Sequence, residues 1–128
     1  MASAATTIKL FGVYVMLTGL TLLLTPNLLL VLFGTAEAKE IWIRVLGALA
    51  IVVGYYYWAC AAGNARAFFA ASVQGRLLFF VLGLALIALA GAPWTLALFG
   101  LVDAAGAVWT LAALRAEAKA SLLPAATP

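Results

Sequence analysis

Three charged residues lie inside apolar stretches of this 128-residue sequence: Arg44, Arg76 and Asp103. Asp103 occupies the middle of "LFGLVDAAGAVWTLAAL", residues 98–114. An isolated charge at the centre of a membrane costs roughly 2.5–3.5 kcal/mol, and such residues usually pair with another charge or face a polar cavity. The sequence therefore predicts that Asp103 faces the interior of a helical bundle and meets an arginine.

Most other chemistry is excluded by the residue types that are missing. The chain has no histidine and a single cysteine, Cys60. A zinc site needs about four ligands drawn from cysteine, histidine and carboxylates, and serine–histidine or cysteine–histidine catalysis needs a histidine. We predict no metal and no cofactor, with a lipid or a quinone as the ligand left open. An enzyme that acts on a lipid would have only Asp103, tyrosines and arginines as acid and base, so a non-enzymatic role is favoured.

The composition places the chain in a membrane. Hydrophobic residues make up 68% of the sequence and charged residues only 9%, whereas a soluble domain carries roughly 25% charged residues. Seven basic and four acidic side chains could not cover the surface of a soluble protein of this length. We therefore expect an integral membrane protein.

Four apolar segments match the length of about 20 residues that a membrane-spanning helix needs. They lack the alternation of apolar and polar residues that is typical of membrane β-strands. The sequence predicts one all-α domain over residues 1–128, a four-helix bundle followed by a loose tail at 115–128. The predicted helices cover residues 9–33, 41–62, 67–91 and 94–114.

Positive charge predicts the orientation of this bundle, because cytoplasmic loops carry an excess of lysine and arginine. An even number of spans places both termini on one side, together with the second loop. That side carries Lys9, Arg66, Arg76, Arg115 and Lys119, and the other carries Lys39 and Arg44. We expect both termini in the cytoplasm and a location in the bacterial inner membrane. The net charge of +3 requires no nucleic acid, because the basic residues would face anionic lipid.

Two arginines are candidate partners for Asp103. At about 1.5 Å of rise per residue, each arginine lies roughly 9 Å in depth from Asp103. Arg44 is close enough to the outer interface to extend its head into water, whereas Arg76 is drawn inward because the apolar run after it is too short to span alone. We predict a pair between Asp103 and Arg76, with Arg44 as the second choice. Whether this pair is structural or functional stays open.

Aromatic and hydroxyl residues on the same helix faces extend this centre. Side chains one turn apart share a face of a helix. The functional interpretation is a small polar cavity that holds the polar head of a quinone, a sterol or a lipid. Its candidate residues are Asp103, Arg76, Arg44, Tyr55, Tyr14 and Thr18.

Three stretches resemble a known group of membrane proteins: "GLTLLLTPNLLLVLFG", "RVLGALAIVVGYYYWA" and "GRLLFF". They combine a glycine-spaced first helix that ends near Pro26 with Arg-x-x-Gly at the start of the second helix. The first two-thirds of the chain is similar to the DoxX-like group of small four-helix bacterial membrane proteins. This resemblance implies a fold and a membrane location more than a function.

The function expected first is a non-catalytic subunit or accessory factor of a larger membrane complex. The sequence has short loops and no stretch that could form a soluble domain, and apolar helices with small and aromatic residues suit packing against lipid and other helices. We expect membrane lipids and a larger complex, or further copies of this chain, as partners. The alternative is binding or transport of a small lipophilic ligand around Asp103 and Arg76.

Overall fold

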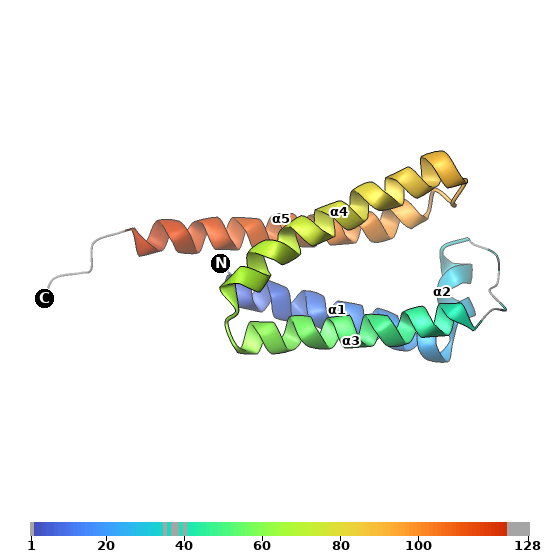
Figure 1. Ribbon diagram of the computed structural model, residues 1–128, viewed down its shortest axis with the longest axis horizontal. Helices are drawn as coiled ribbons and strands as arrows, with labels where there is room; N and C mark the ends of the chain where they lie inside the picture. The colour runs from blue at the N-terminus through green and yellow to red at the C-terminus, as the bar shows by residue number, and fades with distance from the viewer. Residues whose placement is uncertain (1, 35, 37–38, 40, 123–128) are drawn as a thin grey trace, which may run out of the picture.

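The computed structural model describes residues 2–34, 36, 39 and 41–122, and over these residues it is helical with no strand (Figure 1). Four of the helices are long and apolar enough to cross a membrane, which confirms the all-α prediction and supports an integral membrane protein. The helices are α1 (Ala4–Leu24), α2 (Pro26–Leu32), α3 (Trp42–Ala62), α4 (Arg66–Ala90) and α5 (Leu96–Ser121).

The first predicted span, 9–33, is not a single helix. It begins earlier, at Ala4, because the Ser3 side chain accepts a hydrogen bond from the backbone N–H of Thr6 and caps the helix. It is also divided, since α1 ends at Leu24 and α2 begins at Pro26. Proline lacks a backbone N–H and disfavours helical geometry in the residue before it, and Thr25 accordingly has φ −138° and ψ 64°.

The last helix is longer than the predicted range of 94–114. It starts at Leu96 and continues to Ser121, so residues 115–121 are helical instead of forming a loose tail. The sequence "RAEAKAS" explains this difference, because alanine, glutamate, lysine and arginine are strong helix formers. The rest of the predicted tail, 123–128, lies outside the described residues, as do the loop acids Glu37 and Glu40.

Glycines bring the backbones of α1 and α3 into close contact. A Cβ atom built on Gly54 would lie 2.7 Å from the carbonyl oxygen of Gly12, and one built on Gly47 would lie 2.7 Å from that of Gly19. Any larger residue at these positions would push the helices apart. The two helices therefore form the first pair of the bundle, the α1–α3 pair.

The second pair consists of α4 and α5, which run side by side and antiparallel (Figure 1). Their connection turns at Gly91, which has φ +69°, a left-handed conformation that glycine adopts without strain. The N–H of Ala92 donates to the carbonyl oxygen of Leu86 and completes the helix cap. Gly100 of α5 packs against Phe80 of α4, and a Cβ atom there would lie 2.6 Å from the ring.

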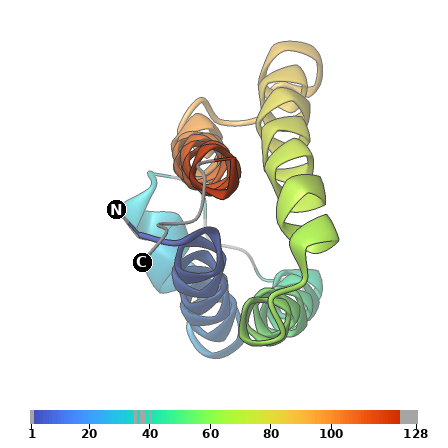
Figure 2. The same cartoon turned by 90° about the vertical axis from the view of Figure 1, so that its left-hand side faces the viewer.

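Seen end-on, the four long helices follow one another round the bundle in the order α1, α3, α4, α5 (Figure 2). We call the end with the start of α1, the α3–α4 turn and the end of α5 the terminal end, and the opposite end the α2 end. The two pairs lie close together at the terminal end and separate toward the α2 end (Figure 1). The buried core lies at the terminal end and consists of Ala4, Ile8, Ala61, Phe69 and Ala113.

The α2 end is bridged by aromatic rings. Phe33, which caps α2, stacks on Phe99 of α5 with a ring-centroid distance of 4.3 Å. Since Pro26 divides the first span, α2 turns away from α1 and places Phe33 on the opposite pair. The centre of the bundle thus lies between a packed terminal end and this aromatic contact.

Candidate functional site

Arg76 is the most buried charged side chain that the structure describes, with 2% of its surface exposed. It lies near the middle of α4. Its Nε donates to the carbonyl oxygen of Ser72 at 3.2 Å. Its Nη2 donates to the hydroxyl oxygens of Ser72 at 3.2 Å and of Thr110 at 2.9 Å. The guanidinium therefore connects α4 to α5 through charge-assisted hydrogen bonds.

The direction of the hydroxyl hydrogen bonds around Arg76 follows from counting hydrogens. Thr7 donates its one hydroxyl hydrogen to the carbonyl oxygen of Ala4 at 2.7 Å. The Thr7 and Thr110 hydroxyl oxygens are 2.8 Å apart, so Thr110 must be the donor in that bond. The result is an ordered chain of hydrogen bonds from Arg76 through Thr110 and Thr7 to the start of α1.

Aromatic rings cover the faces of the same guanidinium. Its Cζ lies 4.6 Å from the ring centroid of Phe11 in α1 and 5.9 Å from that of Tyr57 in α3. A cation over an aromatic face is stabilised by about 0.5–2 kcal/mol. Arg76 thus contacts all three other long helices and connects the two helix pairs.

One nitrogen of Arg76 has no hydrogen-bond acceptor. Nη1 is buried and makes no hydrogen bond within the described part of the protein. It lies against Gly106 of α5, where a Cβ atom would be 3.2 Å away. Gly106 and Asp103 lie on the same face of α5, and Asp103 is one turn nearer the α2 end. Nη1 therefore lies against the turn of α5 that leads to Asp103.

Asp103 is half-buried and, among the described residues, accepts no hydrogen bond and forms no ion pair within 4.0 Å. The predicted pairing of Asp103 with Arg76 is present as an electrostatic interaction, but the two side chains form no contact ion pair in the described part of the protein. The reason is the direction of Arg76, which reaches for Thr110 toward the terminal end. Thr110 lies seven residues, or about 10 Å, along α5 from Asp103.

Arg44 does not reach this centre at all. Its Nη1 donates to the carbonyl oxygens of Leu23 and Leu24, the latter at 3.2 Å. These carbonyls lie at the end of α1, where the break at Pro26 leaves them without the usual helical donors. Arg44 is therefore a helix cap supplied by α3, and the second choice of partner for Asp103 is wrong.

The aromatic candidates divide between the surface and the centre. Tyr55 is 55% exposed and packs against Tyr56 at the outer surface of α3, so it is not part of the centre. Tyr57, which the sequence interpretation missed, contacts Phe11 with a ring-centroid distance of 5.2 Å. The available signal was its spacing of three residues from Gly54, whose face packs against α1.

Tyr14 and Thr18 both lie on α1. The two side chains are one turn apart and interact with each other. Tyr14 also lies within electrostatic range of Asp103. The structure therefore brings Asp103 near Arg76 and Tyr14, and Thr18 next to Tyr14. It separates Arg44 and Tyr55 from them.

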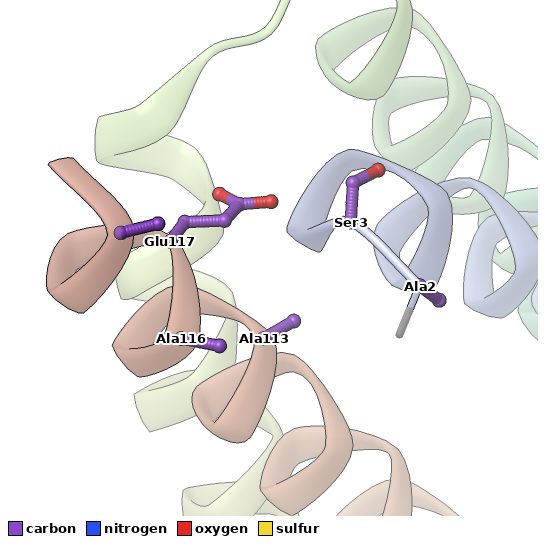
Figure 3. A pocket seen from close by; sticks show the side chains of 6 residues that line it. Ala2, Ser3, Ala113, Ala116 and Glu117 are labelled. Atoms are coloured by element: carbon purple, nitrogen blue, oxygen red, sulfur yellow. The ribbon is translucent and has the colours of Figure 1, made fainter. Parts of the chain in front are cut away.

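A second polar cluster closes the terminal end. Glu117 of α5 accepts a hydrogen bond of 2.7 Å from the backbone N–H of Ala4 and forms an ion pair with Arg66 at the start of α4. The open pocket beside it has a volume of about 260 Å³ (Figure 3). Its lining is Ala2, Ser3, Ala113, Ala116, Glu117 and Ala120. Because its one charged group already has two partners, this pocket offers a ligand little besides methyl groups.

Comparison with protein-family models, curated proteins and solved structures finds no match to this chain. The DoxX-like resemblance therefore stays a prediction. Within the described ranges, no three histidine, cysteine or acidic residues lie close enough together to hold a metal ion.

Proposed function

We propose that this chain is an integral membrane protein that binds the polar head of a lipophilic molecule between its two helix pairs. The observation that carries this proposal is Asp103, a half-buried carboxylate with no hydrogen bond and no contact ion pair among the described residues. It is the eighth residue of α5 and lies about 10 Å from the helix start, deep within a spanning segment.

The free-energy cost of burying such a carboxylate indicates that it has a partner beyond the described residues. Burying an uncompensated charge at mid-membrane depth costs roughly 2.5–3.5 kcal/mol. Within the protein, Arg76 directs three of its five N–H groups to Ser72 and Thr110 and none to Asp103. Arg76 offsets part of this cost through its electrostatic interaction with Asp103. A bound polar head would supply the hydrogen bonds that the described residues do not give to the carboxylate.

The surroundings of Asp103 suit a lipophilic ligand. The bundle is tightly packed at the terminal end and bridged by Phe33 and Phe99 at the α2 end, and Asp103 lies between them. Phe11 and Tyr57 supply apolar ring surface beside the polar groups. Small-molecule sites usually have an apolar lining with a few polar groups.

The membrane and orientation of the proposed site follow from the basic residues. We place the terminal end in the cytoplasm of a bacterial cell and the α2 end at the outer face of the inner membrane. Support comes from Lys9, Arg66, Arg115 and Lys119, which lie toward the terminal end. Fusion of a reporter that is active only in the cytoplasm to the C-terminus tests this orientation, and an inactive reporter would contradict it.

An accessory subunit of a larger membrane complex is the second proposal. It is favoured by α4, in which only 11% of the residues in the most apolar window are buried, the lowest share of the four long helices. The half of α4 toward the α2 end exposes large side chains on several sides, among them Leu78, Val81, Leu82 and Leu89. Lipid covers such a helix as well as a protein partner does, so this observation weighs less than Asp103.

Native mass spectrometry of the protein, released from its own membrane in mild detergent, separates the two proposals. Ligand binding predicts a small species that retains a lipophilic molecule of defined mass. An accessory role predicts larger subunits at fixed stoichiometry. A protein that carries neither would contradict both.

A further inference from the structure

We infer that the head group bound at this centre is a neutral hydroxyl, so that the ligand is a lipophilic alcohol or phenol. The inference rests on the proposed function and specifies the chemical class of its ligand. It follows from the donors and acceptors that the described residues leave unused.

Hydroxyl hydrogens around Arg76 are already directed elsewhere. Ser72 donates its hydrogen to the carbonyl oxygen of Phe69 at 2.8 Å, and Thr7 donates to that of Ala4. Thr110 donates to Thr7, as the hydrogen count above requires. These three hydroxyls therefore have no hydrogen left for Asp103, and the nearby hydroxyls of Tyr14 and Tyr57 form no hydrogen bond to it in the described part of the protein.

Among the charged groups of the centre, one donor and one acceptor lack a hydrogen-bond partner in the described part of the protein. Nη1 of Arg76 is buried without an acceptor. Asp103, as a carboxylate, only accepts and has no donor among the described residues. Both belong to one region, because Nη1 lies against Gly106, one turn from Asp103 on the same face of α5.

The charges of these two groups disfavour an ionic head. A carboxylate or phosphate would be attracted by Arg76 and repelled by Asp103, and an ammonium group the reverse. In a low-dielectric surround such repulsion is poorly screened. A neutral head avoids both penalties.

A hydroxyl group satisfies both unused groups. Its oxygen accepts from an N–H, and its hydrogen is donated to a carboxylate. A carbonyl or ether oxygen only accepts, so it would leave Asp103 unpartnered. Sites that hydrogen-bond a hydroxyl discriminate strongly against analogues that lack it, because buried polar groups are then left unpaired.

Rings around the centre suit the body of such a ligand. Phe11 contacts Tyr14 and Tyr57 with ring-centroid distances of 5.7 Å and 5.2 Å. Such rings present apolar surface that favours contact with a further ring or with a chain of methylene groups. Aliphatic alcohols and phenols both remain within the inferred class.

The experiment uses delipidated full-length protein in detergent and two matched pairs of probes. The first pair is 1-dodecanol and dodecyl methyl ether, and the second is 4-octylphenol and 4-octylanisole. Binding is followed by the rise in unfolding temperature and by adducts in native mass spectra. We expect at least one hydroxyl probe to bind about 10-fold more tightly than its ether, the equivalent of one lost hydrogen bond to a charged group.

Variants connect this preference to Asp103. Asp103→Leu removes the acceptor and should abolish the difference between each alcohol and its ether. Glu117→Gln removes the carboxylate at the terminal end and should leave the difference unchanged. Whether the alcohol or the phenol binds more tightly distinguishes an aliphatic lipid from a ring-bearing ligand.

Equal binding of hydroxyl probe and ether would overturn the hydroxyl inference while leaving the proposed function standing. Tighter binding of dodecylamine or dodecanoate would do the same. If no probe binds, the inference fails, and the mass spectrum of the native protein still decides the proposed function independently.

Discussion

Arg76 and Asp103 differ in the number of hydrogen bonds and ring contacts that the protein gives them. Arg76 makes two hydrogen bonds to Ser72 of its own helix and one to Thr110 of α5, and it contacts the rings of Phe11 and Tyr57 in two further helices. Asp103 has no hydrogen bond from the described residues. We therefore regard Arg76 as a residue that connects the helices and Asp103 as the residue left for a ligand.

Thr110→Val tests the connecting role of Arg76. The substitution keeps the side-chain shape but removes both the acceptor for Nη2 and the donor to Thr7. We expect it to lower the free energy of unfolding by about 1–3 kcal/mol, because the buried Nη2 of Arg76 loses one of its two acceptors. Thermal unfolding in detergent measures this change.

Thr21→Val is the matched control for that variant. The Thr21 hydroxyl donates only to the carbonyl oxygen of Leu17 in its own helix and is not buried. Its loss should change the stability by no more than about 0.5 kcal/mol. Equal effects of the two substitutions would contradict the connecting role of Arg76.

Asp103→Leu tests whether the carboxylate is structural by the sign of its effect. Removal of one partner of a buried ion pair destabilises a protein by about 3–5 kcal/mol. Removal of an unpartnered charge from the membrane interior relieves a cost instead. We expect the unfolding temperature of delipidated Asp103→Leu protein to rise above that of the wild type, and a clear fall would show that the carboxylate is structural.

Sequence reasoning found the central charges but not their geometry. Charge within apolar runs identified Arg76 and Asp103, because charges are rare and costly there. Depth along the helix could not reveal that Arg76 turns toward Thr110, because that choice depends on which neighbouring helix presents a hydroxyl. Tyr55 was predicted because it shares a helix face with Arg44. The glycines of α3 define the face that packs against α1, and Tyr57 lies on that face while Tyr55 points to the outer surface.

Among the helices, the α1–α3 pair is the most closely packed, and it depends on four glycines. Gly54→Ala would place a methyl group 2.7 Å from the carbonyl oxygen of Gly12 and 2.8 Å from the backbone nitrogen of Met16. Since backbone atoms cannot move aside, the helices must separate. We expect a loss of about 1–3 kcal/mol in thermal unfolding measurements.

Gly83→Ala provides the comparison within a spanning helix. A Cβ atom built at Gly83 meets nothing within 4 Å in the described structure. Alanine has a higher helix propensity than glycine, so this variant should be neutral or stabilised by up to about 1 kcal/mol. If Gly83→Ala destabilises as much as Gly54→Ala, the packing explanation is wrong.

The cap that Arg44 provides depends on the break at Pro26. Arg44→Ala should destabilise the protein, because the carbonyl oxygens of Leu23 and Leu24 lose their donor. In a Pro26→Ala background, a continuous helix would supply backbone N–H groups to those carbonyls, and Arg44→Ala should cost less. A double-mutant cycle of unfolding temperatures measures this coupling, and equal costs in both backgrounds would contradict it.

For the helices, the existence of four spanning segments was predictable, but the ends of the first and the last were not. Hydropathy identifies α3 and α4 within a residue or two, because polar residues precede α3, Gly63 and Asn64 separate the two helices, and Gly91 and Pro93 follow α4. It missed the break in the first segment, since the apolar run continues through Pro26. It also missed the helical residues 115–121, whose alanines and charges are too polar for a membrane signal but favour a helix.

The whole molecule consists of two helix pairs that meet at the terminal end and separate toward α2 (Figure 1). The sequence predicted an all-α bundle but not this division. It arises from glycine contacts within the α1–α3 pair, from the Gly100–Phe80 contact in the other pair, and from the few buried residues between them. These contacts depend on residues distant in the chain, which periodicity along a single helix does not reveal.

The central claim is that Asp103 holds a lipophilic ligand between these pairs. The most direct measurement is mass spectrometry of organic extracts from equal amounts of purified wild type, Asp103→Leu and Glu117→Gln. We predict one molecule at near-stoichiometric amounts in the wild type and in Glu117→Gln, and its loss from Asp103→Leu. Equal amounts of every extracted molecule in all three proteins would contradict the claim.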